Sequence, residues 1–171
     1  MIEILHRYTK AGLYHDELAQ SVRDAVIAAV ASGADLTGAD LSGADLSGAK
    51  GVNPWLSTPL RMLLDQPGLI RAYKLVNEYG KGPYHGGIKY EVGQAYEVAE
   101  ADTDETHQCA TGINLATLSW CAQSWRRGYR ILVAEFTAAD IAAIPNATDG
   151  KFRVHRCNIV GEVDLAERGI A

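Results

Sequence analysis

The chain of 171 residues has little of what marks several protein classes. It has three cysteines, Cys109, Cys121 and Cys157, without the even count and regular spacing of a disulfide framework, so we expect free thiols in a reducing compartment. No apolar run approaches the roughly 18 residues that a membrane helix needs. The first residues also lack the apolar core of a signal peptide. These absences predict a cytoplasmic protein without membrane contact.

An excess of basic residues is also missing. Lys and Arg number 16 against 21 Asp and Glu, which gives a formal net charge of −5. Because nucleic-acid binding usually needs a basic face that neutralises phosphates, we expect no nucleic-acid partner. The composition, 47% hydrophobic and 22% charged, is that of a packed globular protein.

Familiar catalytic signatures are absent as well. The sequence has no phosphate-binding loop, dinucleotide glycine motif, nucleophile elbow or pair of catalytic carboxylates. Two His-x-Cys pairs, at 107–109 and 155–157, could each place two zinc-ligand types on one face of a strand. They lack the tight paired-cysteine spacing of structural zinc sites. We therefore expect no metal and no cofactor.

One short repeat stands out. Residues 34–38, 39–43 and 44–48 share the pattern Ala-Asp-Leu-Ser/Thr-Gly, and 49–52 are a decayed fourth copy. A five-residue period fits a coil in which each copy forms one side. These residues resemble the pentapeptide-repeat family, whose right-handed β-helix is four-sided. The resemblance implies one turn over 34–52, with leucines inward and aspartates outward: Leu36, Leu41 and Leu46, and Asp35, Asp40 and Asp45.

The remaining patterns predict an α+β fold in three parts, residues 1–54, 55–68 and 69–171. The first holds a hairpin, a helix over 22–31 with Ser21 as its N-cap, and the repeat coil, which this helix and Trp55-Leu56 are expected to cap. The second is a helical linker. The third is a mixed, mainly antiparallel sheet with short helices. Its expected strands are 69–76, 88–92, 95–98, 130–136 and 152–163, with an exposed acidic segment at 99–106, a helix over 114–127 capped by Asn114, and a short helix that begins with a capping box at Thr137 and Asp140.

A second resemblance covers the later part of the chain. The motifs at 71–74, 109–113, 131–136 and 161–163 follow the order found in small ADP-ribosyltransferase-type domains. The resemblance implies that Arg71 would grip NAD and Glu162 would hold a ribose hydroxyl. The Ser-Thr-Ser and Glu-x-Glu motifs of those enzymes are missing. Residues 71–165 also resemble uncharacterised domains that follow pentapeptide repeats in bacterial and phage proteins.

These observations predict a noncatalytic protein-interaction or structural protein, phage-encoded, in the cytoplasm or the virion. It would coat a particle or inhibit a host protein, through a protein partner or self-association. Four tyrosines flank a glycine-rich loop and are the expected contact residues: Tyr79, Tyr84, Tyr90 and Tyr96. The alternative is an ADP-ribosyltransferase-like, NAD-using enzyme that depends on Arg71 and Glu162.

Overall fold

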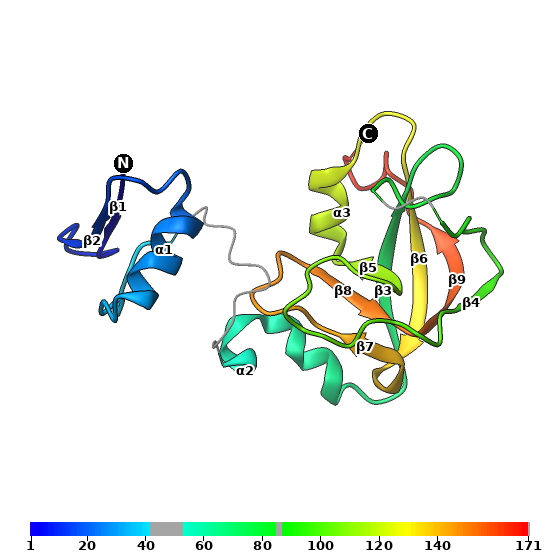
Figure 1. Cartoon of the computed structure of the whole chain (residues 1–171). Coiled ribbons are helices and arrows are strands. Elements are labelled where there is room, and N and C mark those ends of the chain that lie inside the picture. The colour runs from blue at the N-terminus through cyan, green and yellow to red at the C-terminus, as the bar shows by residue number, and fades with distance from the viewer. Residues whose placement is uncertain (42–52, 85–86, 171) are drawn as a thin grey trace. The chain divides into compact units, whose positions relative to one another are not determined.

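The protein is described by a computed structural model that covers residues 1–41, 53–84 and 87–170. The chain divides into two compact units, Met1–Leu46 and Ser47–Ala171 (Figure 1). Each unit has its own hydrophobic cluster, and each is described below by itself.

The N-terminal unit is a hairpin covered by one helix. Strands β1 (Ile2–Leu5) and β2 (Gly12–Asp16) pair antiparallel, and helix α1 (Val22–Ala31) begins where predicted, with the Ser21 side chain accepting from the Asp24 amide. Its core consists of Ile4, Ala19, Ala25, Ala29 and Ala39. Because four of these five residues are alanines, the helix backbone can approach the hairpin closely.

The C-terminal unit is built on one antiparallel sheet of seven strands, ordered β4-β9-β6-β3-β5-β8-β7. The helix α2 (Pro54–Ser57) and the 3-10 helix η1 (Pro59–Asp65) precede it. The strands are β3 (Leu69–Val76), β4 (Ala95–Glu97), β5 (Ile113–Ala116), β6 (Arg130–Thr137), β7 (Ile141–Ala143), β8 (Lys151–Val154) and β9 (Arg156–Glu162); α3 (Leu118–Ser124) and η2 (Ala138–Asp140) connect them. The α+β class and the antiparallel sheet are therefore confirmed.

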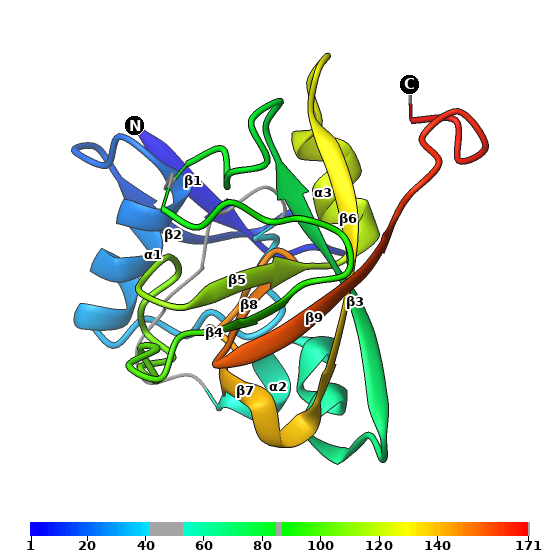
Figure 2. The ribbon, with the colours of Figure 1, turned by 90° about the vertical axis from the view of Figure 1, so that its right-hand side faces the viewer.

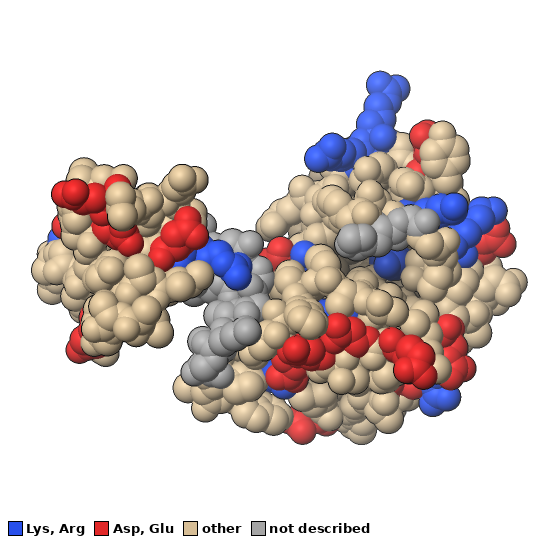
Figure 3. Space-filling view, viewed as in Figure 1, with Lys and Arg blue, Asp and Glu red and all other residues tan. Residues whose placement is uncertain are grey.

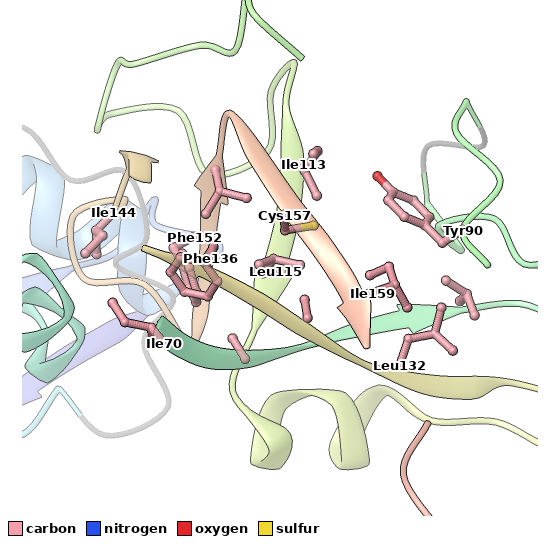
Figure 4. Packing of buried hydrophobic residues seen from close by; sticks show 14 residues of the cluster. Ile70, Tyr90, Ile113, Leu115, Leu132, Phe136, Ile144, Phe152, Cys157 and Ile159 are labelled. Carbon is pink, nitrogen blue, oxygen red and sulfur yellow. The ribbon is translucent and has the colours of Figure 1, made fainter. Parts of the chain in front are cut away.

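The sheet bends sharply between β3 and β5. These two strands are aligned at a single pair, Tyr73 with Ala116, whereas β3 and β6 are aligned along their whole length. Figures 1 and 2 show β5 and β8 crossing the β3 and β6 strands at a steep angle. The main core fills the fold between the two halves (Figure 4), and includes Ile70, Ile113, Leu115, Leu132, Phe136, Phe152, Val154 and Ile159. On the opposite face of β3 and β6, α3 packs Cys121 against Leu75 and Ile131.

The predicted helix over 114–127 is wrong at its start. Ile113 to Ala116 form strand β5, and the helix begins only after Thr117, whose side chain accepts from the Trp120 amide. The Asn114 side chain donates to the Ala110 carbonyl instead of capping a helix. A short, mostly apolar run fits a buried strand and a buried helix equally well, and only the pairing of β5 with β8 decides between them.

Two predicted strands also differ from the structure. Residues 88–92 contribute one isolated bridge, Lys81 with Lys89, and no strand. The expected strand over 152–163 is broken at His155 into β8 and β9. Since β8 pairs with β5 and β7, whereas β9 pairs with β6 and β4, the break lets the chain pass from one half of the bent sheet to the other.

Candidate functional site

A cavity of about 570 Å³ opens in the C-terminal unit beside the junction of β3 and β5. Its lining comes from both strands, from residues within 82–84, 87–90 and 109–112, and from Val98, Trp120 and Lys151. The strands share only one aligned pair there, so they diverge and leave space that side chains must fill or enclose.

Lys74 is a buried residue of the cavity lining. Its side chain follows Ile70 and Ala72 on the core face of β3, and the residue is only 8% exposed. The amine donates to the Asn114 carbonyl at 2.8 Å and lies 4.8 Å from the centre of the Tyr90 ring. Because burial penalises the charged form, the pKa of Lys74 falls from its ordinary value of 10.5 to about 8.

Aromatic rings border another side of the cavity. Tyr84 meets Trp120 edge to face, with ring centroids 6.4 Å apart, and the Trp120 indole donates to Asp149 Oδ2 at 2.9 Å. The Lys151 amine lies 5.2 Å from the Trp120 ring centre and 3.7 Å from the Cys109 sulfur. The Trp120 ring is thus fixed between a lysine, a tyrosine and a carboxylate.

The described lining of the cavity is apolar, aromatic and cationic. The described residues that line the cavity include no Asp, Glu or His, so no carboxylate or imidazole among them can act as a general base. They supply apolar surface, aromatic rings and two lysine amines. Of the residues predicted from the sequence, Tyr84 and Tyr90 line this cavity. Lys74 was not predicted, although the period-two pattern of β3 places it on the same face as Ile70, Ala72 and Val76.

The structure separates the four tyrosines expected at a contact surface. Tyr79 and Tyr84 are 68% and 62% exposed and belong to the loop after β3. Tyr90 is only 4% exposed, and its ring packs 4.8 Å from that of the half-buried Tyr96. Two of the four rings are therefore available at the surface, whereas Tyr90 and Tyr96 serve the core.

Arg71 and Glu162, the residues of the enzyme alternative, lie apart from the cavity and from each other. Arg71 is aligned with Glu135 and pairs with it at 2.8 Å, on the face of β3 that carries Tyr73 and Leu75. Glu162 is aligned with the core residue Leu132 and pairs with Arg130. Paired residues share a face, so Arg71 and Glu162 lie on opposite faces of the sheet.

The two His-x-Cys pairs also occupy different surroundings. Cys157 is buried in the main core, and burial raises the pKa of its thiol to about 11. His107 contacts Asp102 Oδ2 through Nδ1 at 2.8 Å, and Cys109 is exposed. Within residues 1–41, 53–84 and 87–170, no group of three or more His, Cys, Asp or Glu side chains is arranged to hold a metal ion.

The first repeat copies dock onto the hairpin of the N-terminal unit. The Asp40 amide donates to the Leu5 carbonyl at 2.7 Å, and the Arg7 amide donates to the Gly38 carbonyl at 2.8 Å. Leu36 and Leu41 are half-buried and pack against the cluster of α1 and β1. The expected full burial of these leucines is therefore only partly met; Leu46 and Asp45 lie outside the described residues.

The outward aspartates make local contacts. Asp35 Oδ1 accepts from the Thr37 amide, and these hydrogen bonds with Thr37 lower the pKa of Asp35. Asp40 is half-buried and pairs with Lys10 at 3.0 Å. Trp55 and Leu56, the other expected caps of the coil, are both exposed.

Gly38 forms the corner of the first copy. The Ala39 amide donates to the Leu36 carbonyl at 3.0 Å, and Gly38 has φ +73°, as position three of a type II turn requires. A Cβ at Gly38 would lie 2.5 Å from His6 Nε2, whereas a Cβ at Gly33, with φ +74°, meets nothing within 4 Å.

Gly38→Ala is therefore expected to weaken the docking of the repeat by about 1–2 kcal/mol, from backbone strain and the His6 contact together. Amide hydrogen exchange in the full chain measures this effect: the Asp40 and Arg7 amides should exchange about tenfold faster or more. Gly33→Ala carries the strain without the contact and should have the smaller effect. Equal rates in both variants would contradict the docked turn.

Charge is distributed in patches on the described surface. In the view of Figure 3, the C-terminal unit carries Lys and Arg mainly on its upper part and Asp and Glu along its lower part. No helix in the described part of the chain has the length and apolar character to cross a membrane.

Comparison with known proteins identifies the repeat alone. A family model for pentapeptide repeats, comprising eight copies, matches residues 27–50. The match begins inside α1, which ends at Ala31, so its first residues are helical here. Neither the curated proteins nor the solved structures gave a match to the chain. Over residues 27–50 the chain is thus similar to the pentapeptide-repeat family.

Proposed function

We propose that this chain is a noncatalytic protein-interaction protein whose C-terminal unit contacts a protein partner through the loop after β3. The observation that carries the proposal is the exposure of Tyr79 and Tyr84, at 68% and 62%, in the loop after β3. Aromatic side chains supply large contact area at low entropic cost and are enriched in protein interfaces. A stable contact needs roughly 800 Å² from each partner, so the surface around this loop must take part as well.

The repeat segment fits such a role as a structural element. Pentapeptide repeats generally mediate structural or interaction functions, and the match over 27–50 supports that coarse assignment. We further propose that residues 34–52 complete one turn of right-handed β-helix, docked through Asp40 on β1 and through Gly38 on Arg7. We propose that the protein is phage-encoded and acts in the cytoplasm or the virion. It would either coat a particle by self-association or bind and inhibit a host protein.

The NAD-using alternative has less support. Its two residues, Arg71 and Glu162, are each held in a separate ion pair and do not face one cavity. Incubation with labelled NAD and a host lysate is expected to transfer no label. Transfer that is abolished by Arg71→Ala or Glu162→Ala would replace the interaction proposal with the enzyme.

A photo-crosslinking amino acid placed at Tyr84 tests the contact directly. In cells that produce the full chain, position 84 should give one dominant protein adduct, because this ring lies at the proposed interface. Tyr8, which is 82% exposed in the N-terminal unit, provides the control position and should not give that adduct.

Once the adduct is identified, Tyr84→Ser should weaken the binding of the purified partner at least tenfold, or about 1.4 kcal/mol. Tyr8→Ser should leave the affinity unchanged. The same adduct from both positions, or an affinity that does not respond to Tyr84→Ser, would refute the proposed surface.

A further inference from the structure

The cavity beside β3 and β5 contains a buried cation, Lys74, for which the described residues supply no matching anion. The Lys74 amine has one carbonyl and one aromatic ring as its described contacts, and the described lining of the cavity includes no carboxylate. Buried charges in proteins are normally paired, since removing an ammonium from water is costly. A bound anion would supply the missing partner.

The described ionisable groups around Lys74 do not provide this negative charge. They are Tyr90, whose ring lies against the amine, the Cys157 thiol on β9, and the Cys121 thiol on α3, behind the opposite face of β3. Burial raises the pKa of all three, to about 11 for Cys157 and about 12 for Cys121, so they remain neutral at pH 7. The ammonium has three N–H donors, and the Asn114 carbonyl takes one of them.

The rest of the cavity lining favours a ligand with a planar, apolar group. Tyr84, Tyr90 and Trp120 line it together with Ile88, Val98 and Leu115. Aromatic rings pack favourably on such walls, in offset or edge-to-face arrangements. Lys151, beside Trp120, adds a second positive charge, so the two charged side chains on the described lining are both cationic.

We propose that this cavity is a binding site for a small aromatic anion, a carboxylate or sulfonate on a planar ring, with the anionic group on the Lys74 amine and the ring against Tyr84 and Trp120. Lys151 attracts the anion and favours it over cations. This site goes beyond the protein-interaction function proposed above: although Tyr84 takes part in both, ligand binding requires only this chain.

Calorimetric titration of the purified full chain with three naphthalene ligands tests the proposal. They are 1-naphthoate, 1-naphthamide and 1-naphthylmethylammonium, which share one ring and differ in charge. Naphthoate should bind at least tenfold more tightly than the amide, and the ammonium should bind most weakly. Naphthoate affinity should also fall at least tenfold from pH 7 to pH 9.5, as Lys74 loses its proton.

Three variants test whether naphthoate binding depends on the lysines of this cavity. Lys74→Met should weaken naphthoate at least tenfold, leave the amide nearly unchanged and remove the pH dependence. Lys151→Gln changes only a partly exposed side chain and should weaken naphthoate binding by a smaller factor. This variant still tests the proposal if Lys74→Met does not fold. The exposed Lys81 lies outside this cavity, and Lys81→Gln should change nothing.

The proposal is overturned if none of the three ligands binds, if naphthoate and naphthamide bind equally, or if Lys74→Met and Lys151→Gln leave naphthoate affinity unchanged. None of these results bears on the protein contact, because the crosslinking test at position 84 uses the partner and no small molecule. The two proposals can therefore fail separately.

Discussion

Arg153→Met is expected to lower the free energy of unfolding by roughly 3–5 kcal/mol, the largest effect we predict for a single substitution in this chain. Arg153 lies on β8, and its side chain is 0% exposed. Chemical denaturation of the full chain, followed by the near-ultraviolet signal of the C-terminal unit, measures the loss.

The expected loss follows from what the guanidinium binds. Arg153 Nε donates to the Asp102 carbonyl at 2.9 Å, Nη1 to that of His107 at 2.5 Å, and Nη2 to that of Asp104 at 2.7 Å. One side chain thus satisfies three carbonyls of the 102–107 segment. Methionine would fill the volume but remove the donor to the Asp102 and His107 carbonyls, each at a cost of roughly 1–3 kcal/mol before the segment relaxes, whereas the Asp104 carbonyl also accepts from the His107 amide.

Two further variants separate this explanation from a general sensitivity to substitution. Arg153→Lys keeps the charge but replaces the planar fork with a point donor, so it should lose roughly half as much stability. Arg127 is exposed in the turn before β6, and Arg127→Met should stay within about 0.5 kcal/mol of the parent. If Arg153→Met were as mild as Arg127→Met, the buried guanidinium would not organise the segment.

Arg153 also shows why part of the structure could not be predicted from the sequence. The 99–106 segment is acidic, and the sequence predicts that it is exposed. In the structure Ala101 is buried and the segment's carbonyls surround an arginine about fifty positions later in the chain. Backbone carbonyls have no sequence signature, so a partner for them is invisible until the fold brings β8 beside the segment.

Elements with a strong local pattern were predicted well. Strand β3 has the predicted bounds, 69–76, and β6 extends one residue beyond the predicted 130–136. Both strands carry buried apolar residues on each of their two faces. The capping box at Thr137 and Asp140 is also present. Signals of this kind are contained within about eight residues, which is why the sequence is sufficient for them.

The candidate site depends on long-range pairing, and the sequence predicted little of it. Tyr84 and Tyr90 were expected at a contact surface, but nothing local indicates that they enclose one cavity with Trp120 and Lys151. Lys74 could have been flagged, because alternation places it on the apolar face of β3. Its place in a cavity depends on the divergence of β3 and β5 after one aligned pair, and only the three-dimensional structure shows this divergence.

Lys74→Met is expected to remove part of the pH dependence of stability. In the folded protein burial lowers the pKa of Lys74 from 10.5 to about 8. Below pH 8 the lysine is charged in both states, and the folded state carries the full cost of burying that charge. Between pH 8 and pH 10.5 the folded protein releases its proton first, so the stability of the parent rises with pH in this window.

The size of the effect follows from the displacement of the pKa. Each unit corresponds to about 1.4 kcal/mol, so the parent should gain roughly 3 kcal/mol relative to Lys74→Met between pH 7 and pH 10.5. The comparison is made as a difference between the two proteins at each pH, which cancels the titration of groups that they share. Lys81→Met alters an exposed lysine and keeps Lys74, so the difference in stability between the parent and this variant should not change with pH.

A constant difference between the parent and Lys74→Met across pH 7–10.5 would mean that the amine keeps an ordinary pKa, and hence that water or a counter-ion reaches it in the folded state. Added 1-naphthoate distinguishes a counter-ion effect from water. If the anion pairs with Lys74, it should stabilise the parent at pH 7 in proportion to its affinity and flatten the rise in stability up to pH 10.5. Lys74→Met should respond to naphthoate far less than the parent at pH 7, because the charge that the anion compensates is gone, and the two proteins should respond alike at pH 10.5, where Lys74 is neutral.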